Sequence, residues 1–170
     1  QTANKIYDEM IDFAKYAFNK SHAAAYAVVS YQTAWLKYYF PVEYMAALMT
    51  SVIDNPSKVS EYIYACRQMN IKILPPDINK GEANFSVDGG DIRYGLAAIK
   101  SIGRPVIKAI VEDREELGLF QNLEDFITRL SAKNILNKRT IENLIKAGAL
   151  DGLEGNRRQK MMVYGSLLDN

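Results

Sequence analysis

A helix, a short glycine-containing turn and a second helix occur twice in this sequence, and this repetition constrains the fold more than any other feature. The first unit runs from Ala98 to Val111, and the second runs from Leu144 into a helix that follows Asn156. Glycine permits a tight turn and leaves backbone N–H groups uncovered. The pattern therefore predicts two successive helical hairpins, although two ordinary helix corners capped by glycine fit the spacing equally well.

A turn of this kind can bind a phosphate group, because the next helix points the positive end of its dipole to the same place. Such binding would not read the bases. Hairpins of this kind usually have two glycines in the turn, and the first turn has Ser101 at one of these positions. Pro105 has no N–H group, so one possible donor is missing. The predicted contact residues are Lys100, Ser101, Ile102, Gly103, Arg104 and Lys108 in the first unit, and Lys146, Gly148, Asn156, Arg157 and Arg158 in the second, with Lys160 as a nearby cation.

The rest of the chain is mainly α-helical with a small β hairpin or sheet. Asn122, Asn137 and Asn156 are the expected N-caps of the last three helices. Apolar spacing predicts helices over 4–18, 23–39, 42–52, 57–69, 96–101, 105–117, 123–130, 138–147 and 157–168. Strands are predicted over 71–74, 84–87 and 91–94, with the tight turn Asp88-Gly89-Gly90 joining the last two. We expect a domain boundary near Pro75, which gives domains 1–75 and 76–170.

The densest polar cluster, Asn19-Lys20-Ser21-His22, lies at a helix start, where Asn19 or Ser21 could be the N-cap. One interpretation is an anion site, and the alternative is a plain helix cap with a solvated lysine. Ser21 and His22 lack a third group to orient them as nucleophile and base, so no catalytic residue is predicted. One histidine and one distant cysteine make a metal site unfavourable.

Three further patterns are interpreted as structural. The aromatic residues from Tyr26 to Tyr44 are expected in the core, although they could stack on bases. The charged run from Glu112 to Glu116 is expected to be a solvated helix face. Cys66 is expected to be a small buried hydrophobic residue, and a single cysteine fits a reducing compartment such as the cytoplasm.

Several blocks of sequence resemble one family closely. They are residues 18–26, 29–37, 41–48, 74–79, 92–96 and 144–149. The first block reads Phe18-Asn19-Lys20-Ser21-His22-Ala23-Ala24-Ala25-Tyr26 and is too long and specific to arise by chance. Together they resemble the C family of bacterial replicative DNA polymerases, the family of the DNA polymerase III alpha subunit, and its DnaE type in particular.

The resemblance implies a fragment of a polymerase. Residues 1–75 resemble the C-terminal part of the helical fingers, and residues 76–170 resemble a small β connection followed by a tandem helix-hairpin-helix module that binds duplex DNA without sequence specificity. The catalytic aspartates of the family lie in a palm domain that has no counterpart here, so we expect no catalysis by this chain alone. The intact enzyme would be a DNA-directed DNA polymerase, a nucleotidyltransferase, with Mg²⁺ on the palm.

The resemblance also favours the anion interpretation of Asn19, Lys20, Ser21 and His22, which would bind the triphosphate of the incoming nucleotide. The implied partners are primer-template DNA, the incoming dNTP, the rest of the polymerase chain, and the sliding clamp and replisome subunits through other regions; no membrane is involved. A stand-alone DNA-binding module and a helical protein-interaction module remain alternatives.

The net charge of +1 hides a segregation of charge along the chain. Six acidic residues and one basic residue lie between Glu112 and Asp125, whereas seven basic and three acidic residues lie between Lys133 and Lys160. A nucleic-acid protein usually has a clear basic excess. The sequence therefore predicts a basic second hairpin that holds DNA weakly, as one patch of a larger binding surface.

Overall fold

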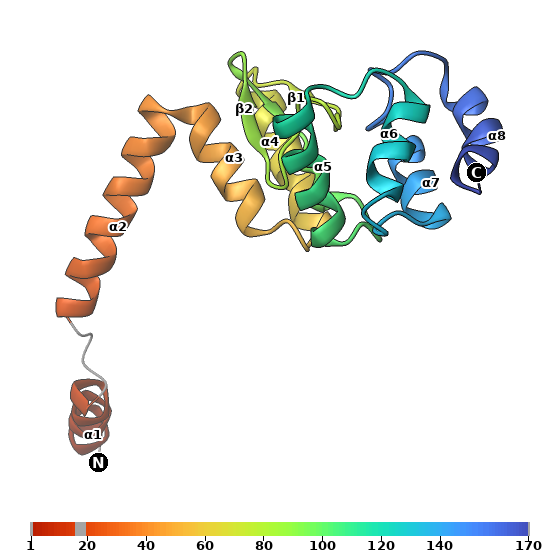
Figure 1. The fold of residues 1–170 in the computed structure, drawn as a ribbon. Helices are drawn as coiled ribbons and strands as arrows, with labels where there is room; N and C mark the ends of the chain where they lie inside the picture. The colour runs from red at the N-terminus through yellow and green to blue at the C-terminus, as the bar shows by residue number, and fades with distance from the viewer. Residues whose placement is uncertain (1, 16–19, 170) are drawn as a thin grey trace. The chain divides into compact units, whose positions relative to one another are not determined.

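The computed structural model of the chain describes residues 2–15 and 20–169. Contacts divide the chain into two compact units, Gln1–Phe40 and Pro41–Asn170, which are described separately (Figure 1). The described residues form eight α-helices, one short 3₁₀ helix and three short strands, which confirms the mainly α fold with a small sheet. None of the described helices is long and apolar enough to cross a membrane.

The first unit contains α1 (Thr2–Lys15) and α2 (Lys20–Tyr39). The prediction that the aromatic residues of α2 lie in a core is wrong, because α2 buries none of its residues. Tyr31 and Tyr38 are 71% and 78% exposed. The aromatic rings instead pack along their own helix, with the centroid of Trp35 4.8 Å from that of Tyr39. Apolar side chains surround this helix rather than forming the single stripe that would direct one face into a core.

The first half of the second unit packs two helices against the sheet. They are α3 (Pro41–Ser51) and α4 (Pro56–Gln68), and proline begins both because its missing N–H is not needed in the first turn. The sheet has the order β1-β3-β2, with β1 (Ile73–Leu74) parallel to β3 (Asp91–Arg93) and β2 (Ser86–Asp88) antiparallel to it. Met45, Met49, Cys66 and Ile92 are almost fully buried in this core, which confirms the interpretation of Cys66.

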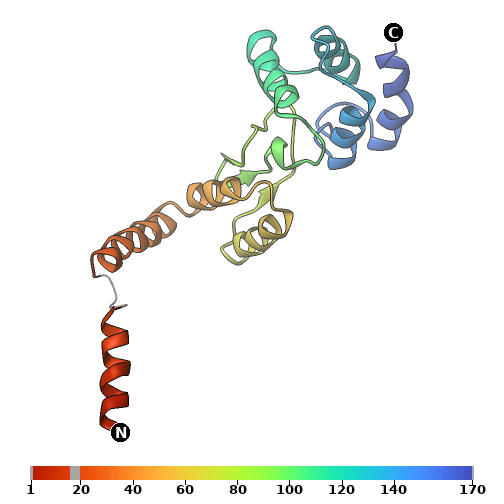
Figure 2. The same cartoon turned by 90° about the horizontal axis from the view of Figure 1, so that it is seen from below.

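The second half contains the 3₁₀ helix η1 (Leu96–Ala98) and four α-helices: α5 (Arg104–Leu117), α6 (Leu123–Ser131), α7 (Lys138–Ala147) and α8 (Arg157–Leu168). Asn122, Asn137 and Asn156 accept hydrogen bonds from the first-turn N–H groups of α6, α7 and α8, which confirms all three predicted caps. Figures 1 and 2 show α8 packed against α6 and α7. A second apolar core lies among these helices, and Tyr94 and Ala97 pack against both cores.

Residues 96–101 were expected to form a short helix, but only Leu96–Ala98 is helical and its turn is 3₁₀. The N–H groups of Leu96 and Ala97 donate to the carbonyls of Glu82 and Ala83, which ties this turn to the neighbouring segment. Ser101 then adopts a positive φ of 64°, which an α-helix cannot continue through. The compact unit 41–170 spans the predicted boundary at residues 75 and 76, so the division into fingers and hairpin module stays a prediction about function.

The charged run of α5 is not simply a solvated face, as the sequence suggested. Asp113 is 1% exposed and pairs with Arg129 and Lys133, at 2.7 and 2.8 Å. Arg114 is also buried and donates to the carbonyls of Ile78 and Gly81. Successive residues of a helix point about 100° apart, so a run of charges meets several neighbours when the helix is covered on more than one side.

Candidate nucleic-acid interface

The first hairpin turn comprises residues 100–103 and leads directly into α5. Ser101 takes the left-handed conformation, with φ 64°, at the position where the usual pattern has glycine. Gly103 is the N-cap of α5 and supplies no side-chain cap, and Pro105 follows within the first turn. The substitution of serine for glycine therefore keeps the shape of the turn, at a cost in backbone strain.

Four consecutive backbone N–H groups of this turn, from Ser101 to Arg104, donate no hydrogen bond within the part of the chain that the structure describes. The side chains of Lys100 and Arg104 are exposed on either side of them, whereas Ile102 is buried. Of Ile102, therefore, the backbone is available for contact with a ligand and the side chain is not. Unpaired N–H groups at a helix N-terminus, flanked by two cations, form an arrangement suited to an anion.

The second hairpin turn follows α7 and differs from the first in its hydrogen bonds. Gly148 ends α7 in the left-handed conformation, with φ 85°, as predicted. Its N–H and that of Ala149 donate back to carbonyls of α7, and the N–H groups of Asp151 and Leu153 are also paired within the turn. Asn156 and Gln159 form a reciprocal capping box at the start of α8. Unlike the first turn, this turn therefore has no run of four consecutive unpaired N–H groups among the described residues.

The cations of the second hairpin are mostly engaged within the protein. Arg157 is paired with Asp151, its Nε lying 2.9 Å from Oδ1, and this pairing holds the pKa of the Asp151 carboxyl below its usual range. Lys146 pairs with Glu142 at 3.0 Å. The side chain of Arg158 is exposed and forms no ion pair or hydrogen bond among the described residues.

Lys160 cannot serve as a nearby phosphate-binding cation, contrary to the sequence interpretation. Its side chain is almost fully buried, and Nζ donates to the carbonyls of Leu153, at 2.9 Å, and Gly155. Burial lowers the pKa of its ammonium group, although nearby Asp151 opposes that shift. Lys160 thus stabilises the segment between the second turn and α8 instead of facing a ligand.

The two hairpins meet through α7. Asn143 Nδ2 donates to the carbonyl of Lys100 at 3.2 Å, and Arg139 Nη2 donates to Ser101 Oγ at 3.1 Å. A cavity of about 360 Å³ is lined both by Lys100 and by Ala147, the residue before Gly148. Arg139 and Asn143 were not among the residues predicted from the sequence. The one pattern that could have indicated them is their i, i+4 spacing, because it places both polar side chains on one face of α7.

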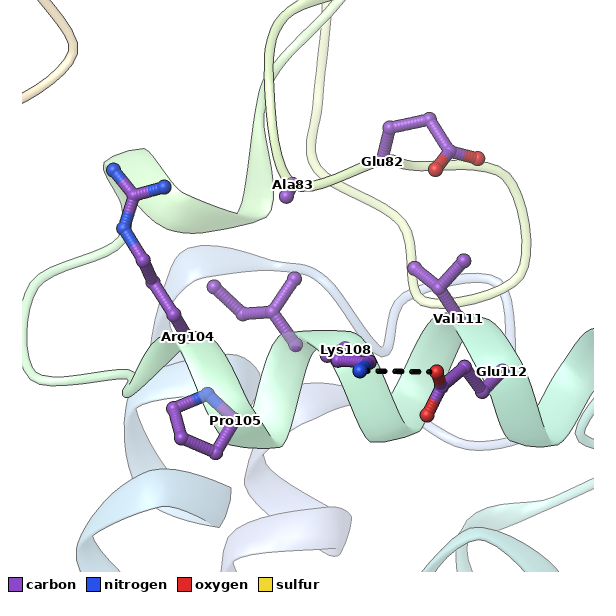
Figure 3. Close-up of a pocket in the computed structure, with 8 residues that line it drawn as sticks. Glu82, Ala83, Arg104, Pro105, Lys108, Val111 and Glu112 are labelled. Atoms are coloured by element: carbon purple, nitrogen blue, oxygen red, sulfur yellow. Dashed lines mark ion pairs between the residues drawn. The ribbon is translucent and has the colours of Figure 1, made fainter.

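Lys108, the last predicted contact of the first hairpin, lies farther along α5. It lines a larger pocket of about 520 Å³ and pairs with Glu112 at 3.5 Å. Figure 3 shows Lys108 directed toward Glu112, whereas Arg104 lies at the other end of the pocket and forms no ion pair with the residues drawn. Among the first-hairpin cations, Arg104 is therefore better placed than Lys108 to meet an external phosphate.

The cluster at residues 19–22 lies in the compact unit formed by residues 1–40. Asn19 is outside the described residues, and Lys20, Ser21 and His22 are exposed in the first turn of α2. Ser21 lies inside the helix, so it is not the N-cap. The ring centroid of His22 lies 4.5 Å from that of Tyr26. Within the described ranges, no group of three His, Cys, Asp or Glu residues could hold a metal ion.

Two helical hairpins joined by α6, the first with an exposed turn that leads into α5, are the arrangement of helix-hairpin-helix proteins. Residues 70–160 match the sequence model of the helix-hairpin-helix motif, and the chain belongs to this family.

The chain is also similar to curated proteins named DNA polymerase III subunit alpha. Identity is 52% over 163 residues with the protein of Vibrio cholerae, 48% over 169 residues with that of Escherichia coli, and 46% over 168 residues with that of Thermus aquaticus. These matches cover 95%, 99% and 99% of this chain but only 14% of each relative. They confirm the resemblance to the DNA polymerase III alpha subunit.

Proposed function

We propose that this chain is part of a bacterial replicative DNA polymerase and that its helix-hairpin-helix module binds the backbone of duplex DNA without reading sequence. The observation that carries the proposal is the first turn. Its N–H groups from Ser101 to Arg104 donate no hydrogen bond to any described residue, and the exposed side chains of Lys100 and Arg104 lie next to them. Backbone donors and point charges bind phosphate oxygens, which are the same at every base pair. Similarity to the alpha subunits supports duplex primer-template DNA as the partner and the cytoplasm as the location.

A binding titration with fluorescently labelled duplex DNA tests this function. We expect affinity to fall steeply with salt and to be independent of sequence, because each phosphate contact releases counterions. Arg104→Ala should reduce the slope of log K against log salt by about 0.9. Arg67→Ala, which removes another exposed arginine from α4, should leave the slope unchanged. Absence of binding at low salt would support a helical protein-interaction module instead.

For the compact unit 1–40, we propose that residues 19–22 help to position the triphosphate of the incoming nucleotide. Exposure of Lys20, Ser21 and His22 in one helical turn supports this role. In the complete polymerase the chemistry would be phosphoryl transfer with Mg²⁺ bound by other parts of the enzyme, and this chain would contribute charge and orientation without catalysing the reaction alone. The sliding clamp and other replisome subunits would bind elsewhere on the polymerase.

A substitution in the complete polymerase tests the nucleotide site. Lys20→Ala should raise the KM for nucleotides or lower kcat, because a positive charge next to the triphosphate is lost. Lys37→Ala, at the exposed C-terminal end of the same helix, is the matched control and should change neither. An unchanged kcat/KM for Lys20→Ala would overturn this assignment.

A further inference from the structure

We propose that Arg139 contacts the DNA backbone together with the first hairpin turn, so that both helix-hairpin-helix units contribute to one phosphate-binding surface. Arg139 lies in the first turn of α7, the helix that leads into the second hairpin turn. The proposal rests on the proposed binding of duplex DNA and adds a residue that the motif pattern does not include.

The pairing of the other cations distinguishes Arg139. Of the seven basic residues from Lys133 to Lys160, four have a carboxylate partner and Lys160 is held by carbonyls. Arg139 and Arg158 are the two that form no ion pair in the described part of the chain. A paired cation contributes less charge to a ligand than an unpaired one, because its own carboxylate also repels phosphate. The usable charge of this region is thus concentrated on two arginines.

Of these two arginines, only Arg139 contacts the first hairpin turn among the described residues. Its Nη2 donates to Ser101 Oγ at 3.1 Å, which places the guanidinium beside the unpaired N–H groups that begin at Ser101. The hydroxyl is a neutral acceptor, so the positive charge of Arg139 is not compensated there. A guanidinium carries five N–H donors, and those left over can bind phosphate oxygens. Arg139 therefore adds a positive charge at the Ser101 end of the run of N–H groups, whose other end is the N–H of Arg104.

The bond from Asn143 to the carbonyl of Lys100 fixes this arrangement. It lies one helical turn after Arg139 and holds α7 against the first turn. Because both contacts come from one rigid helix, Arg139 is positioned before DNA arrives, and little entropy is lost on binding.

The test compares adjacent cations of α7 in the 170-residue chain. Arg139→Ala should raise the Kd for a labelled duplex about three- to tenfold and lower the slope of log K against log salt by about 0.9. Lys138→Ala is the matched control, because Lys138 is exposed but paired with Asp169 at 2.8 Å. It should leave the slope unchanged. Arg139→Lys should retain the slope, since the charge remains. Circular dichroism should show the same helix content in all variants.

Two outcomes would overturn the proposal and leave the proposed function standing. In the first, Arg139→Ala behaves like Lys138→Ala while Arg104→Ala still lowers the salt slope. In the second, Arg139→Ala weakens binding with an unchanged slope, as we expect for Asn143→Ala, which would mean that Arg139 only positions the turn. If the unsubstituted chain does not bind duplex DNA at low salt, the proposed function and this inference both fail.

Discussion

At the scale of single residues, the left-handed positions of the hairpins determine where the chain can turn. Ser101 and Gly148 both have positive φ, and Gly148 is in addition closely surrounded. A Cβ on Gly148 would lie 2.2 Å from Arg157 Nη2 and 2.9 Å from Asp151 Oδ2. The Arg157–Asp151 pair therefore occupies the space that a side chain would need, and glycine is required there for two reasons.

We expect Gly148→Ala to destabilise the protein more than Gly89→Ala. Gly89 also has positive φ, but nothing lies within 4 Å of its hypothetical Cβ, so that substitution measures the backbone strain alone, about 1 kcal/mol. Gly148→Ala adds the displacement of Arg157 from its exposed ion pair with Asp151, which costs about 0–1 kcal/mol more. Chemical denaturation of both variants measures the difference. Equal losses would show that the guanidinium moves aside without cost.

At the scale of elements, buried ion pairs join helices that apolar contacts alone would hold less specifically. Asp113 on α5 receives a hydrogen bond from Arg129 Nε on α6 and an ion pair from Lys133, just after α6. Arg129 also lies over the ring of Phe120, with Cζ 4.3 Å from the centroid. Burial disfavours the ionised carboxylate, but hydrogen bonds and charges from Lys133 and Arg129 outweigh burial and hold the pKa of Asp113 below its usual range.

This pairing predicts a loss of stability in acid. A lowered pKa in the folded state means that the contribution of Asp113 is fully present above its ordinary pKa of 3.8 and disappears as the pH falls through the lower folded value. Asp113→Asn should cost about 3 kcal/mol at neutral pH, because it leaves two cations without their carboxylate. Its free energy of unfolding should also fall less between neutral pH and pH 2.

Denaturation at several pH values measures the effect of Asp113→Asn. Glu116→Gln is the matched control, since Glu116 is exposed on the same helix and forms no ion pair in the described part of the chain. A parallel loss of stability in Asp113→Asn and the unsubstituted chain across the acid range would contradict the assignment.

At the scale of the whole molecule, the buried apolar residues lie in one of the two compact units. The fully buried hydrophobic residues of the described chain run from Met45 to Leu153, within residues 41–170. Burial of apolar surface is the main source of stability. Residues 41–170 alone should therefore unfold cooperatively, with a thermal midpoint within about 2 °C of the 170-residue chain. A much lower midpoint, measured by circular dichroism, would show that residues 1–40 contribute to the core.

Local signals explain which parts of the fold and site could be predicted. Asparagine caps, proline starts and the glycine at position 148 act within a few residues, and the helices that they bound are found close to the predicted ranges. The contacts of Arg139 and Asn143 join residues 38 and 43 positions apart, and no local pattern encodes them. The burial of Lys160 likewise depends on how α8 packs, so counting basic residues overstated the charge available to DNA.

The hydrogen bonds between α7 and the first turn have a consequence for how such tandem units evolve. Two copies of a motif that acted separately could change independently, but here the serine at position 101 accepts a hydrogen bond from Arg139, and Asn143 holds the carbonyl of the residue before it. Glycine at position 101 would relieve backbone strain and at the same time remove the acceptor of Arg139. Across relatives, the residues at positions 101, 139 and 143 should therefore covary, and each hairpin limits the substitutions that the other can accept.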